Sequence, residues 1–184
     1  MSRGVYVVGD SGAGKTTFAR RLAATASLRH VEMDALHHLP GWQERPATEL
    51  RELFLQQVTR DGDGWVADGN YWTSVGDLVL EHADVVVWLD LPRRLAVRRV
   101  LLRTLRRGLT REALWHGNRE SLRSLLSLDP AVSIVAWSWT QHPVYRARYA
   151  ELSCAPGPRW VRVRTAAAAE VVLRELTAEL RTGR

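Results

Sequence analysis

Eight residues near the start of the chain have the types and spacing of a phosphate-binding loop. They read Gly9-Asp10-Ser11-Gly12-Ala13-Gly14-Lys15-Thr16 and fit the pattern G-x-x-x-x-G-K-[ST] without a mismatch. Glycines let the backbone curve around an anion, and amide N–H groups and the start of the next helix point at it. We therefore predict that these residues, together with Thr17, bind ATP. Lys15 is expected to reach the β- and γ-phosphates and Thr16 to hold Mg²⁺.

Lys15 is also the only lysine of the chain, whereas Lys and Arg together number 26. A compact ammonium kept at this one position, in a chain that otherwise uses arginine, supports a catalytic role for Lys15.

Three aspartates follow short apolar runs, where parallel strands would bring their carboxyl ends to one edge of a sheet. If the γ-phosphoryl group of ATP passes to the hydroxyl of an acceptor molecule, Asp34 is expected to bind that acceptor and to serve as the catalytic base for its hydroxyl. The alternative for Asp34 is a helix N-cap. Asp68 is expected to act on Mg²⁺ through water and, with Gly69, Asn70 and Tyr71, to line the acceptor site. For Asp90 we favour a cap on the helix that begins after Pro92.

Arginines recur at helical spacing after that point. Arg99, Arg103 and Arg107 share one helix face, with Arg106 beside them, and further arginines lie at 111, 119 and 123. An arginine can stabilise the charge of a transferring phosphoryl group. Most of these side chains are expected to be solvated, and Arg103, Arg107 and Arg119 are predicted to be catalytic.

The position of each aromatic or histidine residue decides whether it is assigned to the ligand side or to the core. Trp42 and Tyr71 are expected in loops on the ligand side, where they would stack on a ring-bearing acceptor. His37 and His38 are adjacent and diverge, so a metal pair is not expected. Trp65, Trp88 and Trp160 fall in predicted strands and are assigned to the core.

Strands alternating with helices predict a three-layer α/β fold around a parallel sheet. Strands are expected at 5–8, 29–33, 65–67, 85–89 and 160–163. Helices are expected at 16–26, 47–60, 78–82, 93–107, 110–128 and 166–180, with a broken helix over 131–149 interrupted near His142-Pro143. Residues 1–184 are expected to form one domain.

Composition bounds the function. The chain is 46% hydrophobic and 25% charged, with no apolar run of membrane-spanning length. The first residues do not resemble a signal peptide, and the single cysteine, Cys154, leaves no internal disulfide; we therefore expect a cytoplasmic protein. The net charge of +6 allows a polyanionic partner. A monomer or a homodimer fits equally well.

With these motifs in order, the chain resembles the adenylate-kinase-like P-loop proteins often labelled DNA topology modulation proteins. The matching segments are the P-loop, Asp34, residues 40–42, residues 68–71, residues 89–92 and residues 117–120, the last similar to members from actinobacteria. The resemblance implies the fold of nucleoside monophosphate kinases and shikimate kinase, with a five-stranded parallel sheet and an arginine-bearing lid at about 104–128. It also implies transfer of the γ-phosphoryl group of Mg-ATP to a small acceptor, either a hydroxyl metabolite or a nucleoside monophosphate. A regulatory or nucleic-acid-associated ATPase is the alternative, although no nucleic-acid-binding module is recognised.

Overall fold

The protein is built around one five-stranded parallel sheet. In this computed structural model, the described residues are 3–60, 62, 64–120, 127, 129–130 and 132–182. The strands are β1 (Gly4–Gly9), β2 (Arg29–Glu32), β3 (Trp65–Asp68), β4 (Val85–Leu89) and β5 (Arg159–Val163), in the order β2-β3-β1-β4-β5. The predicted fold class is confirmed.

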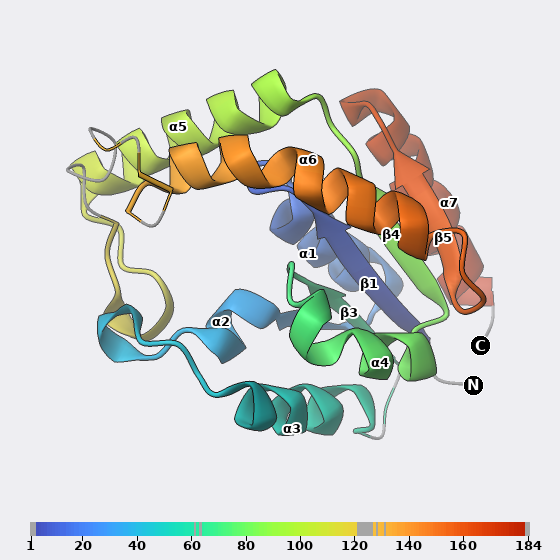
Figure 1. Ribbon diagram of the computed structural model, residues 1–184. Helices are drawn as coiled ribbons and strands as arrows, with labels where there is room; N and C mark the ends of the chain where they lie inside the picture. The colour runs from blue at the N-terminus through green and yellow to red at the C-terminus, as the bar shows by residue number, and fades with distance from the viewer. Residues whose placement is uncertain are drawn as a thin grey trace.

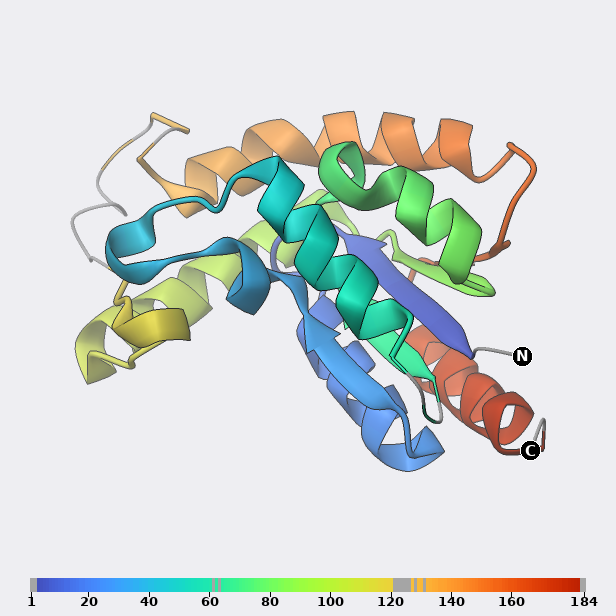
Figure 2. The ribbon, with the colours of Figure 1, turned by 90° about the horizontal axis from the view of Figure 1, so that it is seen from below.

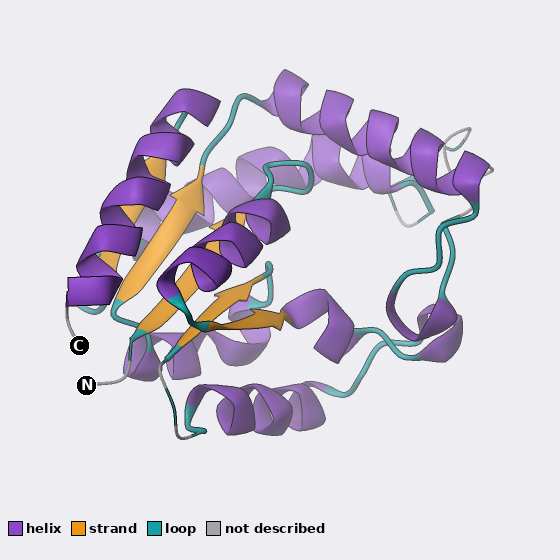
Figure 3. Cartoon of the chain, turned by 180° about the vertical axis from the view of Figure 1, so that it is seen from behind, coloured by secondary structure: helices purple, strands orange, loops and turns teal. Residues whose placement is uncertain are grey.

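Helices cover both faces of the sheet (Figures 1 and 3). On one face, α1 (Lys15–Ala26) and α7 (Ala166–Thr182) share a core with the side chains of Val5, Val7, Val85 and Val87. On the other face, α3 (Ala47–Val58), α4 (Trp72–His82) and the end of α6 (Ile134–Leu152) pack on the remaining strand residues. Because both faces are buried, β1, β3 and β4 are continuous apolar runs, as expected for a parallel sheet.

The lid region extends from one end of this core. Helix α5 (Arg93–Thr110) runs away from the sheet, and α6 lies beside it and returns to the sheet (Figure 1). The short helix α2 (Met33–His37) and the 3-10 turn η1 (Pro40–Trp42) meet a second 3-10 turn, η2 (Trp115–Gly117). Figure 2 shows both chain termini at the end of the molecule opposite this region.

The register of the sheet brings the polar strand ends together. Val7 pairs with Asp68, Asp68 with Glu32, and Gly9 with Leu89. The P-loop, the residues after β3 and the residues after β4 therefore share one edge, as is usual for ligand sites of open α/β sheets.

Three expectations about the helices were wrong or incomplete. The described part of 111–120 is not a continuous helix: Arg111 adopts a left-handed conformation that ends α5, and only η2 is helical beyond it. The rest of the expected 110–128 helix lies largely outside the described residues. Helix α4 begins at Trp72, six residues before the expected start at Leu78. Helix α5 runs three residues beyond Arg107, to Thr110.

Helix α6 is not broken at Pro143. It runs from Ile134 to Leu152 with the proline inside, although proline removes one helical hydrogen bond. Ser138, His142 and Tyr149 are buried at helical spacing on both sides of the proline, so tertiary contacts hold the two halves in one helix. No described helix is both long and apolar enough to cross a membrane.

Candidate active site

The P-loop joins the end of β1 to the start of α1, as the motif predicts. Gly12 has a φ of 79° and lies against α5, where a Cβ would collide with the carbonyl oxygen of Ala96. Gly14 has a φ of 94° and is the N-cap of α1, a conformation that L-residues with a side chain rarely adopt. The backbone around these glycines thus directs the first turn of α1 toward the loop. Such helix starts bind phosphate through free N–H groups and the helix dipole.

Lys15 lies among carboxylates. Its Nζ donates a hydrogen bond of 3.1 Å to the carbonyl oxygen of Asp10. Burial lowers the pKa of Lys15, whereas the charges of Asp34, Asp68 and Asp10 raise it. Arg103 lowers it further, so the ammonium lies within electrostatic reach of both the acceptor-side carboxylate and the lid.

Thr16 and Asp68 form the candidate magnesium site. The Thr16 hydroxyl donates to Asp68 Oδ2 over 2.7 Å, and His30 Nε2 lies 2.8 Å from Asp68 Oδ1. Only 2% of Asp68 is exposed. No group of three or more His, Cys, Asp or Glu residues within the described parts of the chain could hold a metal. A hydroxyl and one carboxylate fit Mg²⁺, which commonly takes few protein ligands and completes its shell with water and phosphate oxygens. His30 was missed by the sequence analysis.

Asp34 faces Tyr71 across the acceptor side. The Tyr71 hydroxyl donates to Asp34 Oδ1 over 2.8 Å, and burial, followed by the charge of Asp34, raises the pKa of Tyr71 far above its ordinary value. Asp34 is the second residue of α2, whose N-cap is Glu32. The alternative that Asp34 caps a helix is therefore wrong.

The segment after β3 is used mainly for packing. A Cβ at Gly69 would lie 2.8 Å from both Met33 Cβ and the Tyr71 ring, so protein atoms occupy the space expected for a ligand. Asn70 Oδ1 accepts hydrogen bonds from the Gly9 backbone N–H at 3.4 Å and from the Tyr149 hydroxyl at 3.1 Å. Asn70 thus joins the P-loop to α6.

The lid arginines differ in their surroundings. Arg103 is half-buried, and no hydrogen bond or ion pair joins it to another described residue. Burial and then the charge of Arg107 lower its pKa, opposed by Glu120 and Asp34. Arg107 Nη1 lies 2.8 Å from Glu120 Oε1. Arg119 has an exposed side chain. Arg103 therefore has no partner in the described part of the chain, and its charge acts on Lys15. Arg99, one turn earlier on α5 and also half-buried, likewise has no hydrogen bond or ion pair there.

Arg106 and Arg111, at the far end of α5, are exposed, whereas Arg103 is half-buried. Arg106 pairs with Glu112 over 3.0 Å. Arg123 lies outside the described residues.

The lid is docked on η1 through one asparagine. Buried Asn118 accepts a hydrogen bond from the Trp42 backbone N–H at 3.1 Å and donates one to the Leu39 carbonyl at 2.8 Å. Trp42 Nε1 donates to the carbonyl of Arg119 over 3.2 Å. His38 stacks on Trp115 with ring centroids 5.6 Å apart. Trp42, expected to face the acceptor, is thus engaged with the lid, and 38% of it is exposed.

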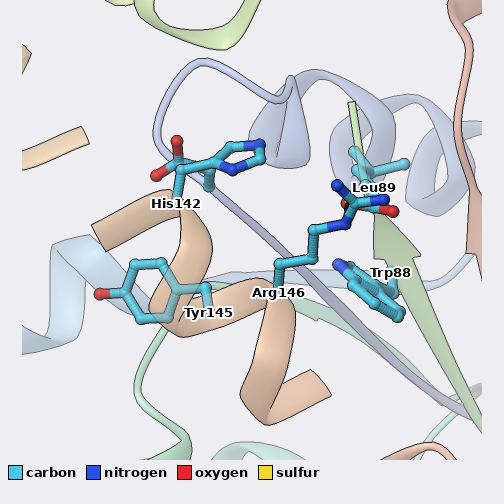
Figure 4. Close-up of a pocket in the computed structure, with 7 residues that line it drawn as sticks. Trp88, Leu89, His142, Tyr145 and Arg146 are labelled. Carbon is cyan, nitrogen blue, oxygen red and sulfur yellow. Dashed lines mark ion pairs between the residues drawn. The ribbon is translucent and has the colours of Figure 1, made fainter. Parts of the chain in front are cut away.

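Helix α6 supports the P-loop from behind. Asp10 Oδ2 accepts a hydrogen bond of 2.9 Å from the Ser138 hydroxyl, and Oδ1 accepts one from the Ser11 N–H. Burial raises the pKa of Asp10. A cavity of about 10 Å³ lies beside Asp10, between α6 and the end of β4 (Figure 4). That volume is at the lower limit for one water molecule, so the cavity does not hold a substrate.

Asp90 is part of the same region and does not cap α5. Arg162 Nη2 lies 2.6 Å and Arg146 Nε 3.4 Å from its carboxylate oxygens, and Pro92 is the N-cap of α5, with no side-chain cap. Figure 4 shows Arg146 pointing from α6 toward the end of β4. The capping interpretation was wrong because arginines from β5 and α6, distant in sequence, neutralise this buried carboxylate.

The remaining predictions about tryptophans have mixed outcomes. Trp65 and Trp88 are buried, as expected, whereas Trp160 on β5 is half-buried. Cys154 is a free, exposed thiol.

Comparisons with known proteins agree with this geometry. No family model matches the chain. The shikimate kinase of Thermosynechococcus vestitus is 28% identical over 118 residues, which span 52% of this chain and 58% of that enzyme. The chain therefore matches little more than half the length of this relative.

Solved structures match over nearly the whole chain. A shikimate kinase from Acinetobacter baumannii in complex with shikimate has a TM-score of 0.59 and 18% identity, covering 99% of this chain and 95% of that one. A gluconokinase from Sinorhizobium meliloti has a TM-score of 0.53 and 19% identity, covering 98% and 92%. At these identities the likeness concerns the fold. The chain has the adenylate-kinase-like fold of the P-loop kinases.

Proposed function

We propose that this protein is a small-molecule kinase that transfers the γ-phosphoryl group of Mg-ATP to a hydroxyl-bearing acceptor. One observation carries the proposal: the P-loop hydroxyl of Thr16 donates to Asp68 at the end of β3 over 2.7 Å, beside Lys15, whose charge interacts with those of Asp34, Asp68 and Arg103. A nucleotide-binding loop, a metal carboxylate, an acceptor-side carboxylate and an unpaired arginine thus lie around one point. The kinase relatives support the same reaction class.

The residues have distinct roles in this reaction. The P-loop N–H groups and Lys15 bind the phosphates, and Thr16 and Asp68 would hold Mg²⁺. Bound Mg²⁺ would neutralise charge on the β- and γ-phosphate oxygens. Arg103 would stabilise the charge that spreads over the transferring group.

Asp34 is the base. Tyr71 holds Asp34 Oδ1, and Oδ2 has no hydrogen-bond partner in the described part of the chain. In the transfer step, the acceptor hydroxyl gives its proton to Asp34 while its oxygen bonds to the γ-phosphorus. The bond from that phosphorus to the bridging oxygen breaks, and ADP leaves with that electron pair. We expect this reaction to take place in the cytoplasm.

The test is a screen for ATP-dependent phosphorylation. Purified protein would be incubated with Mg-ATP and a panel of sugars, polyols, nucleosides and nucleoside monophosphates. ADP release and the phosphorylated product would be measured, with Lys15→Ala as the inactive control. Product formation that needs both the acceptor and Lys15 is expected. ADP release that is independent of every acceptor but stimulated by DNA would instead indicate the ATPase alternative.

A further inference from the structure

Two arginines beside the acceptor side, Arg45 after α2 and Arg51 on α3, are already paired within the protein. From this arrangement, and resting on the proposed kinase function, we infer that the acceptor is an uncharged hydroxyl compound, without a carboxylate or phosphate group. Enzymes that bind an anionic acceptor need a cation that is free to pair with it, because an unpaired buried charge is costly. The availability of each cation therefore decides the class of acceptor.

Arg51 is held by α4. Its Nη1 and Nη2 each lie 2.6 Å from one oxygen of Asp77, and Nη1 also donates to the Ser74 carbonyl over 2.7 Å. A two-pronged pair of this kind uses the guanidinium edge that would otherwise bind a ligand carboxylate or phosphate. Arg51 thus fastens α3 to α4.

Arg45 is held by α2 and α3. Its Nε donates to the Leu36 carbonyl over 2.7 Å, and its Nη1 lies 3.1 Å from Glu49. The Arg45 backbone N–H also donates to the His37 carbonyl. Arg45 therefore fixes the turn after α2 and is not available to an acceptor.

Carboxylates without a close arginine partner remain on the acceptor side of the site. Asp34 has no arginine partner among the described residues, and Glu44 lies 3.9 Å from His37. Glu32 has its pKa raised by burial, then by the charge of Asp68, and Arg20 lies 3.8 Å from it. An anionic acceptor placed beside Asp34 would face repulsion that these groups do not offset.

Two half-buried arginines of the donor-side helix α5, Arg99 and Arg103, have no ion pair among the described residues. Arg99 Nη1 comes within 3.9 Å of the place that a Cβ on Gly14 would take, so it lies against the P-loop and is expected to bind the donor phosphates. Arg103 interacts electrostatically with both Lys15 and Asp34 and is expected to bind the transferring phosphoryl group. Arg107, one turn further, is neutralised by Glu120. In the described part of the lid, no further half-buried arginine is left to bind an acceptor anion.

An aromatic cluster offers the acceptor a binding surface that does not depend on charge. His37, His38, Trp42, Tyr71 and Trp115 form a chain of ring contacts with centroids 4.7 to 6.4 Å apart, and Tyr71 joins it to Asp34. Ring faces of this kind bind the apolar face of a sugar or a planar base without needing opposite charge. The site thus suits a neutral ring compound whose hydroxyl reaches Asp34.

The experiment uses acceptors matched except for charge. Shikimate would be compared with its methyl ester, gluconate with glucitol, and AMP with adenosine, within a wider panel of sugars and nucleosides and their acidic counterparts. In every pair that is phosphorylated, kcat/KM for the neutral member is expected to be at least ~10-fold higher. A higher kcat/KM for the anionic members would overturn this inference and leave the kinase function standing. Transfer to no member of the panel would overturn both.

A binding measurement checks the cause of the selectivity. Asp34→Asn, saturated with a non-hydrolysable ATP analogue, would be titrated with the anionic and neutral members of each pair. Removal of the carboxylate charge is expected to strengthen binding of the anionic members relative to the neutral ones. Glu52→Gln, an exposed carboxylate on α3, is the matched control. Equal selectivity in wild type and Asp34→Asn would contradict the electrostatic argument.

Discussion

The Thr16 hydroxyl lies 2.7 Å from Asp68 Oδ2, so the second residue of α1 and the last residue of β3 share one hydrogen bond. This contact joins the nucleotide-binding loop to the neighbouring strand. It also brings together the two oxygen donors that the sequence assigns to Mg²⁺. The His30 ring, 2.8 Å from the other carboxylate oxygen, fixes the orientation of Asp68.

The first prediction concerns this pair. Asp68→Asn retains an oxygen that can accept from Thr16 but removes the charge that would attract Mg²⁺. We expect the Mg²⁺-dependent gain in ATP affinity to fall by about 10-fold or more, with metal-free ATP affinity unchanged. Calorimetric titration with and without Mg²⁺ measures both, with exposed Glu175→Gln as control. An unaltered magnesium effect would exclude Asp68 as a metal-site residue.

The second prediction concerns Lys15. Lys15→Ala removes the ammonium expected on the β- and γ-phosphates, while Gly12 and Gly14 still shape the loop. Hydrogen bonds to charged groups contribute about 1.5–3 kcal/mol, so ATP affinity should fall at least ~10-fold. Turnover should be abolished and the circular dichroism spectrum preserved. Wild-type affinity and turnover in this variant would remove Lys15 from the site.

Local sequence patterns predicted the parts of the fold that local chemistry determines. The P-loop, all five strands and the parallel sheet follow from glycine spacing and short apolar runs. Predictions failed where distant residues decide the outcome. The ion pairs of Asp90 come from β5 and α6, and the intact α6 depends on residues buried on both sides of Pro143.

For the site too, local patterns marked some residues, whereas residues positioned by contacts between distant segments were missed. Asp34, Asp68 and Lys15 were predicted because strand ends and motifs mark them, and the folded chain places both aspartates within electrostatic reach of Lys15. Asn118 lies in the matching segment 117–120, but that match assigns it no role, and Ser138 carries no motif of its own. Their roles depend on the lid docking on η1 and on α6 packing against the P-loop. The involvement of Arg107 with Glu120 likewise depends on how the chain folds back after α5.

The third prediction separates the lid arginines. Arg103→Ala should lower kcat by on the order of 10³-fold while changing the KM for ATP little, because Arg103 is unpaired and would bind the charge that develops during transfer. Arg106→Ala, on the same helix but exposed and paired with Glu112, is the matched control and should keep wild-type kcat. Arg107→Ala and Arg119→Ala complete the series. An equal kcat for Arg103→Ala and wild type would show that Arg103 does not contact the phosphoryl group.

The fourth prediction concerns pH and stability. Burial raises the pKa of Asp10 in the folded protein, so between its ordinary value of about 4 and the raised value the folded state holds more protons than the unfolded state. The contribution of Asp10 to stability must therefore fall as pH rises through this window. Asp10→Asn, which can still accept from Ser138, should lose that part of the pH dependence.

Urea unfolding over a pH series measures the difference. Asp77→Asn is the control with the opposite sign, because the hydrogen bond from Arg51 lowers the pKa of Asp77 to about 2. Asp77 stabilises the protein above the ordinary carboxyl pKa, and that contribution is lost as the pH falls. Parallel pH profiles for wild type and Asp10→Asn would contradict the prediction.

The last prediction concerns the base. Asp34→Asn keeps the side-chain shape and an oxygen that can accept from Tyr71, but it cannot take a proton from the acceptor. Positioned general bases contribute about 10²–10⁴-fold, so transfer to a hydroxyl acceptor should nearly vanish while ATP binding stays at the wild-type level. A nucleoside monophosphate acceptor is already ionised and would need no such base. At an effective dielectric of about 20, two like charges about 4 Å apart cost roughly 4 kcal/mol, so Asp34 also disfavours that acceptor. The decisive measurement is a coupled ADP-release assay of both proteins with AMP and with hydroxylated compounds. Strong phosphorylation of AMP by Asp34→Asn would refute the base role and indicate a nucleoside monophosphate kinase instead.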